Sequence, residues 1–359
     1  MKKKILHVIN SMTAGGAETL LANSLSPGGL QEYTDNIVVY FQGSSHLTNI
    51  IDKEVEIHCL AYKGILSLPA TLRKLRRMIK EHKIDIVHTH LCPASFYTHL
   101  AIPGNVPQVH TMHTTYSMDT EARPIMRYLE RNLYLKKKDC KLILLSDFTK
   151  ADFLETVSFK GKTFVLNNFV PDSFFENPVK KYDPPQPRLK LIAAGTLKEL
   201  KNFEYLLEVF KHLKNEEVYL DIFGGGNKTK YEQEINTHGL KVRMMGYREN
   251  LESVFPDYDV FVLPSKFEGF PLVVFEAMAS GVPLLLSNIL PVKSIVNEHA
   301  TYFDLDNAEA TAGIIKQILN KEIDISAMAA KAKTYADQLV RRETYLKGLL
   351  AIYEQVTTS

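Results

Sequence analysis

The sequence lacks the features that would place the chain in a bilayer or in an oxidising compartment. Its 359 residues contain no apolar run near the roughly 18–20 residues that span a membrane. The three cysteines, Cys59, Cys92 and Cys140, are too far apart for a zinc-ligand spacing or a disulfide framework. The basic start MKKKILHVIN leads into one short strand and a glycine loop, which is not typical of a signal peptide. We therefore expect a cytoplasmic protein with reduced thiols.

The chain also lacks a strong excess of either charge, because 43 Lys and Arg face 41 Asp and Glu. We expect no nucleic-acid partner. The positive charge is concentrated in two helical stretches, residues 71–83 and 123–141. A solvated helix face explains each stretch, and attraction to an anionic membrane surface or a diphosphate-linked lipid is the alternative.

Short apolar strands alternate with helices, and this rhythm stops once and then restarts. The strands expected before the interruption are 4–9, 37–41, 55–60, 84–89, 107–112, 141–145 and 163–167, and those after it are 189–195, 218–223, 241–245 and 260–263. The expected helices are 17–25, 69–82, 94–101, 122–137 and 147–156, then 202–214, 229–238, 250–255, 272–280, 306–320, 325–337 and a last one from about 341. Such alternation is typical of α/β proteins with mostly parallel sheets covered by helices on both faces.

The interruption lies at residues 178–188, PVKKYDPPQPR, which hold four prolines and no periodicity. We place a domain boundary there, between an N-terminal domain of residues 1–180 and a C-terminal domain of residues 181–340. Both are expected to be doubly wound, Rossmann-like domains. Such sheets bind ligands at the carboxyl ends of their strands, so we expect the two domains to share a central cleft.

Residues 259–286, DVFVLPSKFEGFPLVVFEAMASGVPLLL, are the most informative stretch. A buried strand leads into a turn that contains Glu268, and a helix follows in which Glu276 lies about one turn from the start. Carboxylates suit ligand hydroxyls, while N–H groups at a helix start suit phosphate or sugar oxygens. The N–H groups expected to point into the crevice belong to Phe270, Leu272 and Val273. This segment therefore predicts a site for an anionic, polyhydroxylated ligand.

With its EGFP turn, its EAMA run and Gly281, this stretch resembles the E-x7-E signature of the retaining glycosyltransferases of family 4. The resemblance implies the GT-B fold, two Rossmann-like domains facing a central cleft, with the last helix (about 341–359) crossing back onto the first domain. It implies that Glu268 holds hydroxyls of a donor sugar and that Glu276 holds ribose hydroxyls. Further donor contacts are implied for Gly269, Phe270, Pro271, Leu272 and Val273.

Residues 195–202, GTLKELKN, resemble the family's G-R-L-x-x-x-K-G/N stretch, in which Arg and Lys neutralise the donor diphosphate. Lys201 matches the family's lysine. Thr196 stands at the arginine position, which departs from the pattern but keeps its place among the donor contacts. Lys198 is a nearby cation that could take over the arginine's role.

Three more segments match the family. Gly15 and Gly16 open the first helix, where backbone N–H groups could hold a phosphate, and an ordinary β–α turn explains them equally well. Tyr247 and Arg248 lie in the segment that lines the nucleobase pocket. His113 matches the single histidine that the family places in the cleft near the sugar C1.

The remaining metal-like patterns have simpler explanations. We interpret His88 and His90 as strand-end histidines bonded to the backbone, because no carboxylate-supported ligand set surrounds them in the sequence. The DYD at 257–259 precedes a buried strand, and the DLD at 304–306 begins a helix. We therefore expect no metal, no other cofactor and metal-independent catalysis.

The resemblance implies a hexosyltransferase that moves a sugar from a nucleoside-diphosphate-sugar, with UDP as the expected nucleotide, and retains its configuration. Catalytic roles are implied for His113, Lys201 and Glu268. The glycine loop resembles those of bacterial surface-polysaccharide enzymes, so the expected acceptor is a glycan or a lipid-diphosphate-linked oligosaccharide, reached from the inner face of the cell membrane. Two alternatives remain: a nucleotide-sugar 2-epimerase, and a non-catalytic relative that binds nucleotide-sugar.

Overall fold

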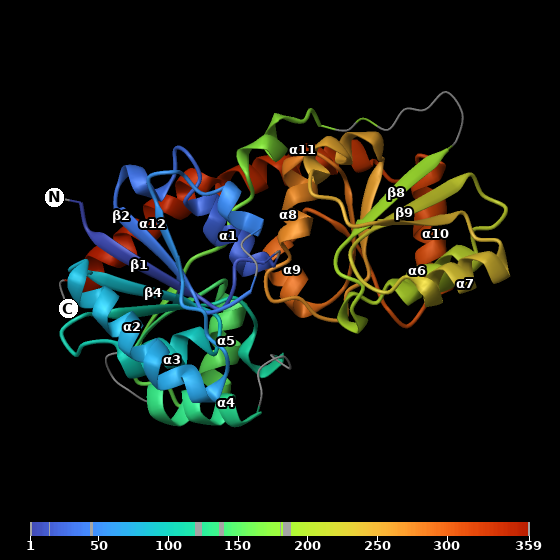
Figure 1. Ribbon diagram of the computed structural model, residues 1–359. Helices are drawn as coiled ribbons and strands as arrows, with labels where there is room; N and C mark the ends of the chain where they lie inside the picture. Colours follow the sequence, from blue (N-terminus) through green and yellow to red (C-terminus); the bar gives the residue numbers. More distant parts are fainter. Residues whose placement is uncertain are drawn as a thin grey trace. The chain divides into compact units, whose positions relative to one another are not determined.

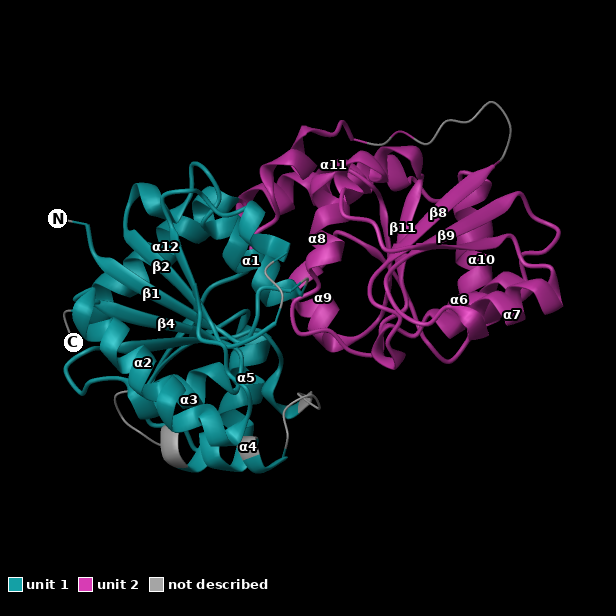
Figure 2. Cartoon of the chain, viewed as in Figure 1, with its two compact units in different colours: residues 1–168, 342–359 teal, residues 169–341 magenta. Residues whose placement is uncertain are grey.

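The chain forms two compact units, each built on one parallel sheet (Figure 2). Unit 1 comprises residues 1–168 and 342–359, and unit 2 comprises residues 169–341. The computed structural model describes residues 2–13, 15–43, 46–118, 124–135, 140–179, 181 and 188–357. Two Rossmann-like parallel sheets confirm the fold class that the sequence predicts. Among the described helices, none is both long and apolar enough to cross a membrane.

Unit 1 has a seven-stranded sheet in the order β3-β2-β1-β4-β5-β6-β7. Its strands are β1 Lys4–Ile9, β2 Asp35–Tyr40, β3 Glu56–Cys59, β4 Ile86–His90, β5 Gln108–Met112, β6 Lys141–Leu144 and β7 Lys162–Val165. Its helices are α1 Gly16–Ser24, α2 Leu68–Glu81, α3 Ala94–Ala101, α4 Pro124–Leu129, α5 Asp147–Thr156 and α12 Arg342–Thr357. The strand order reverses between β1 and β4, which is the switch point of this sheet.

The distribution of apolar residues in unit 1 explains why helices pack on both faces of its sheet. Leu6 and Val8 of β1 face a core cluster to which α2 contributes Leu75 and Ile79, while the charged side of α2 stays exposed. The last helix, α12, belongs to this unit, as the resemblance implied, and in Figure 1 it lies in red among the blue and cyan elements. Helices therefore cover both faces, which suits strands that are apolar almost throughout.

Unit 2 has a six-stranded sheet in the order β10-β9-β8-β11-β12-β13. Its strands are β8 Leu189–Ala194, β9 Val218–Phe223, β10 Val242–Gly246, β11 Val260–Leu263, β12 Leu284–Ser287 and β13 Thr301–Phe303. Its helices are α6 Phe203–Lys211, α7 Thr229–His238, α8 Leu272–Ala279, α9 Leu290–Val296, α10 Ala308–Leu319 and α11 Ile325–Leu339. The α8 and α11 helices pack together, as do α6 and α10 (Figure 1). The switch point of this sheet lies between β8 and β11.

The chain leaves unit 1 for unit 2 earlier than the sequence predicted. The boundary lies after Asn168 rather than between residues 180 and 181. Packing explains the difference. The Phe174 ring lies 6.2 Å from the Phe255 ring, and Lys333 Nζ donates to the Phe175 carbonyl at 2.8 Å. These contacts tie the segment to unit 2, whereas proline content marks only residues 178–188, most of which lie outside the described residues.

Several elements differ from the sequence prediction. The β12 and β13 strands and the α9 helix between them were not predicted. The helix expected at 122–137 is described as α4 followed by a π-helical turn, Glu130–Tyr134, and its ends lie outside the described residues. The α10 helix is capped by Asn307, whose Oδ1 accepts from the Ala310 N–H at 2.8 Å, rather than by the preceding aspartates.

Candidate functional site

The switch point of unit 2 brings together Lys201, which follows β8, and Glu268, which follows β11. Lys201 Nζ lies 2.7 Å from Glu268 Oε1, and Ser265 Oγ donates to the same oxygen at 2.5 Å. Glu268 is buried and the Lys201 side chain mostly so. The Lys266 N–H donates to the Leu200 carbonyl at 2.8 Å, which joins the two loops. A cation and a carboxylate are thus held together where a doubly wound sheet binds its ligand.

Close backbone approach shapes the loop before Lys201. A Cβ at Gly224 would lie 1.8 Å from the Gly195 carbonyl oxygen, so the loops after β8 and β9 can meet only with glycine at this position. The Gly224 N–H then donates to the Gly246 carbonyl at 2.9 Å. Asn202 has φ +55, a left-handed conformation that Gly and Asn adopt more readily than other residues. This explains physically why the motif allows only Gly or Asn after the lysine.

Ser265 is a functional candidate that the sequence analysis missed. Its hydroxyl bonds Glu268, and its carbonyl accepts from Ser287 Oγ at 2.7 Å, which links the end of β11 to the end of β12. The available signal was its position directly after a strand, next to Pro264. Side-chain direction at that point depends on β12, which the sequence did not reveal.

Glu276 lies on α8 with its carboxyl group crowded by protein. Burial raises the pKa of this carboxyl to about 7, with Glu252 adding to the rise and Lys201 opposing it. The Glu276 side chain keeps part of its surface open to solvent, so a ligand can reach it. A carboxyl group in this state gains from hydroxyl donors, because they stabilise its charged form.

The start of α8 corrects one prediction. The Leu272 N–H donates to the Phe270 carbonyl at 2.9 Å, so it does not point unpaired into a crevice. Pro271 caps the helix and forces this tight turn, and the Phe270 ring stacks on Phe275 with centroids 4.9 Å apart. The N–H groups of Phe270 and Val273 have no partner within the part of the chain that the structure describes.

The remaining donor-site predictions lie on loops around this switch point. Tyr247 follows β10 and is largely exposed, and a Cβ at Gly225 would lie 3.9 Å from the Tyr247 Cβ. Thr196, Lys198 and Arg248 are exposed. The Lys201 N–H donates to the Lys198 carbonyl at 3.0 Å, and the roles of all three side chains toward the donor stay predictions.

The switch point of unit 1 is tied together by Asn10, which follows β1. Asn10 Nδ2 donates to the Cys92 carbonyl at 3.0 Å, and its Oδ1 accepts from the Ala94 N–H at 2.9 Å. Gly15 caps α1, and a Cβ there would lie 2.4 Å from Glu18 Oε2. The Glu18 carboxylate therefore lies over Gly15, near the place where the sequence predicted a phosphate, and the two anions would compete for it.

The interpretation of His88 and His90 as backbone-bonded histidines is wrong. His88 Nδ1 pairs with Tyr353 Oη and its Nε2 with Thr111 Oγ1, both at 2.7 Å. His90 Nδ1 lies 3.1 Å from His113 Nε2. Burial lowers the pKa of His88 and His90, and the neighbouring imidazoles lower it further. Strand order creates these pairs, since β4 lies between β1 and β5.

His7, His88 and His90 form a cluster whose ligand atoms all lie within 4.8 Å of one another, a spacing that could hold a metal ion. His88, however, uses both nitrogens in bonds to hydroxyls, and His7 Nε2 pairs with Asn36 Oδ1 at 3.2 Å. Only His7 Nδ1 and His90 Nε2 remain unpaired among the described atoms of the three rings. Two nitrogens fall short of a tetrahedral ligand set, so the group fits a neutral imidazole cluster better.

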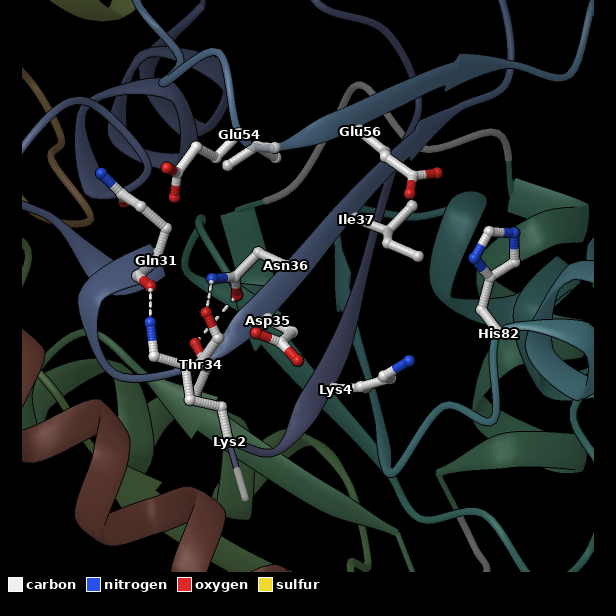
Figure 3. Close-up of a pocket in the computed structure, with 11 residues that line it drawn as sticks. Lys2, Lys4, Gln31, Thr34, Asp35, Asn36, Ile37, Glu54, Glu56 and His82 are labelled. Atoms are coloured by element: carbon white, nitrogen blue, oxygen red, sulfur yellow. Dashed lines mark hydrogen bonds between the residues drawn. The ribbon is translucent and has the colours of Figure 1, made fainter.

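The cavity in Figure 3 lies elsewhere. It has a volume of about 260 Å³ and is lined by Lys4 of β1, Asp35 of β2 and Glu56 of β3, each the first residue of its strand. It therefore lies at the amino ends of the strands, whereas ligands of doubly wound sheets bind at the carboxyl ends. The two switch points, one in each unit, remain the candidate sites.

Comparisons with known proteins match both halves of the chain. The family described as Glycosyltransferase Family 4 matches residues 15–174, and the family described as Glycosyl transferases group 1 matches residues 174–338. An Escherichia coli UDP-Gal:alpha-D-GlcNAc-diphosphoundecaprenol alpha-1,3-galactosyltransferase is 29% identical over 61% of this chain, and the match spans 62% of that enzyme's length. The O-antigen chain mannosyltransferase B of Escherichia coli is 26% identical, with 72% of each chain covered.

Solved structures agree on the fold. A glycosyltransferase from Rickettsia africae has a TM-score of 0.79 at 20% identity, covering 99% of this chain and 98% of its own. HepE of Anabaena, solved with UDP and glucose, has a TM-score of 0.79 at 17% identity, covering 98% and 100%. At these identities the likeness supports the GT-B fold alone.

Proposed function

The chain belongs to the glycosyltransferases of group 1 and family 4, and we propose that it transfers a sugar from a UDP-sugar to a glycan or lipid-diphosphate-linked acceptor. The observation that carries this proposal is the pair of Lys201 and Glu268 at the switch point of unit 2. A donor diphosphate would compete with Glu268 for the Lys201 ammonium. The freed carboxylate then accepts hydrogen bonds from the hydroxyls of the donor sugar.

The cations and the carboxylate of the donor site have different electrostatic roles. Negative charge gathers on the leaving diphosphate, and Lys201 stabilises it more in the transition state than in the ground state. Lys198 supplies the second cation in place of the arginine that Thr196 replaces. Glu276 accepts the ribose hydroxyls, and the raised pKa of its carboxyl fits a site that becomes complete only when a ligand brings donors.

Retention and metal independence are part of the same proposal. His113 contacts the donor sugar near C1, and a diphosphate oxygen takes the proton of the acceptor hydroxyl on the face from which the diphosphate leaves. Analysis of the anomeric proton of the product by NMR tests retention, and an inverted product would contradict it. Full activity in excess chelator tests metal independence, and loss of transfer that manganese or magnesium restores would contradict it.

Exposed cations and apolar side chains on unit 1 support a proposal for the acceptor and the location. The predicted cations Arg73, Lys74, Arg76, Arg77, Lys80 and Lys83 are all exposed on and after α2. Directly before this helix, Leu66 is 96% exposed and Ile65 72%. Cations near an anionic surface contribute about 1 kcal/mol each, and the two apolar side chains can enter the headgroup region. A cytoplasmic enzyme docked in this way would meet a lipid-linked acceptor.

Vesicle sedimentation tests the docking. The protein should pellet with anionic but not neutral vesicles at low salt, and about tenfold more salt should release it because screening shortens the reach of the cations. The variants Arg76→Glu and Leu66→Asp should each weaken pelleting, whereas Lys331→Glu, on exposed α11 surface of unit 2, is the matched control. Equal recovery in the supernatant with both vesicle types would contradict membrane docking.

A product assay separates the proposed transferase from the two alternatives. A thermal-shift screen first identifies the nucleotide, since a ligand at 100 times its Kd stabilises the native state by about 2.7 kcal/mol. Slow release of nucleoside diphosphate from the matching donor without acceptor supports a transferase. Interconversion of two nucleotide-sugars would instead identify an epimerase, and binding without turnover a non-catalytic relative.

A further inference from the structure

The histidine pair of His90 and His113 lies at the switch point of unit 1, and nothing in the sequence motif explains His90. We propose that His90 is a positioning residue, whose hydrogen bond holds the His113 ring so that Nδ1 is the nitrogen presented to substrate. This inference rests on the proposed function, which places His113 beside the donor sugar.

The contact between the rings defines which nitrogen is used. His90 Nδ1 and His113 Nε2 are 3.1 Å apart, and the ring planes differ by 33°. Between two neutral imidazoles one nitrogen donates and the other accepts, so the pair shares one hydrogen. His113 Nδ1 remains, and it has no partner within the described part of the chain although it is buried. A hydroxyl of the donor sugar would supply the missing partner.

His90 is suited to hold another ring in place because it is itself fixed. It is 2% exposed, and its ring lies 4.2 Å from the His88 ring and 5.9 Å from the His7 ring. His88 is in turn held by Tyr353 of α12 and Thr111 of β5. His113, by contrast, follows the last residue of β5 and is only partly buried. The fixed ring therefore orients the less confined one.

Both rings are uncharged near neutral pH. Burial lowers the pKa of His113 to about 3, and it also lowers that of His90, with smaller contributions from the neighbouring imidazoles. A neutral ring offers the substrate one lone pair or one N–H rather than a charge. Which of the two it offers is set by the hydrogen shared with His90.

NMR on the full-length protein with ¹⁵N-labelled histidine tests the positioning directly and requires no substrate. Long-range ¹H–¹⁵N spectra should show His113 as a single neutral tautomer in the parent protein and as a tautomer average in His90→Leu. The control is His110→Gln, which removes a buried imidazole bonded to Thr89 and leaves the histidine pair intact. An unchanged His113 tautomer in His90→Leu would overturn the proposal.

Kinetics give the functional readout. His90→Leu should lower kcat by about 10–100-fold, the usual cost of losing a group that orients another, with little change in donor KM. His90→Asn keeps an amide near the place of Nδ1, so it should recover most of this loss at an equal melting temperature. Equal kcat losses in both variants would overturn the positioning role. If the parent transfers no sugar, the proposed function fails, while the NMR result still decides the tautomer.

Discussion

The two switch points have the same topology but hold different chemistry. In unit 2 the loops after β8 and β11 hold an ammonium and a paired carboxylate, and α8 carries Glu276, whose carboxyl has a raised pKa. In unit 1 the ends of β4 and β5 hold neutral imidazoles, and Glu18 covers the glycine loop. The difference shows that a doubly wound sheet fixes where a ligand binds, while the residues on a few loops determine which charge it meets.

Charge also explains why the buried polar groups of the two sites are stable without ligand. Lys201 and Glu268 satisfy each other, so neither is left buried alone, which would cost several kcal/mol. The histidine pair needs no counter-ion because burial keeps its pKa values low. The charged site is thus the more sensitive of the two to single substitutions.

Lys201→Ala should have the largest effect, because it removes the cation from the charged site. We expect kcat/KM for sugar transfer to fall about 10²–10³-fold, the usual cost of losing one group that stabilises transition-state charge. Steady-state kinetics with the preferred donor provide the measurement. Lys266→Ala is the control, since this exposed lysine pairs only loosely with Glu199 at 3.6 Å. Parent-like rates in Lys201→Ala would remove the lysine from the site.

Glu276→Gln should stabilise the protein at high pH while weakening donor binding. The folded pKa of about 7 exceeds the ordinary value of 4.5, so the native state holds the extra proton between these values. The unfolding free energy therefore falls as pH rises through that window, and Gln, which cannot ionise, removes the loss. Chemical denaturation from about pH 5 to about pH 8 should show a growing advantage of about 1–2 kcal/mol for the variant.

The same variant should raise the donor KM, because a charged acceptor for hydroxyls contributes about 1.5–3 kcal/mol. Glu249→Gln, at an exposed position of the same unit, should change neither quantity. A Glu276→Gln protein that is less stable than the parent at pH 8 would show that the carboxyl is not strained in the ligand-free state.

Asn202 tests how far the backbone sets the position of Lys201. At φ +55, Asn202→Ala should cost about 1–2 kcal/mol of stability, while Asn202→Gly should be nearly neutral. Thermal melts of the two variants provide the comparison, with Gly as the matched control. Equal melting temperatures for Ala and Gly would show that the left-handed conformation does not constrain this loop.

The sequence predicted the alternation of strands and helices and the loops that carry Lys201 and Glu268, because strand ends and turn residues are local signals. It did not predict β12, because Gly281 and Pro283 mark the end of the preceding helix but not the start of a strand of four residues, Leu284–Ser287. The contact between His90 and His113 also could not be predicted from the sequence. It depends on β4 and β5 being neighbours in the sheet, which no local pattern records.

Titration calorimetry with UDP tests most directly whether the switch point of unit 2 is the donor site. We expect one UDP per chain, with affinity lowered about tenfold or more in Glu276→Gln, where a charged hydrogen bond is lost. His113→Ala should bind UDP like the parent, because UDP lacks the sugar that this histidine contacts. Failure to bind UDP, GDP or ADP, or an equal loss of UDP affinity in His113→Ala and Glu276→Gln, would contradict it.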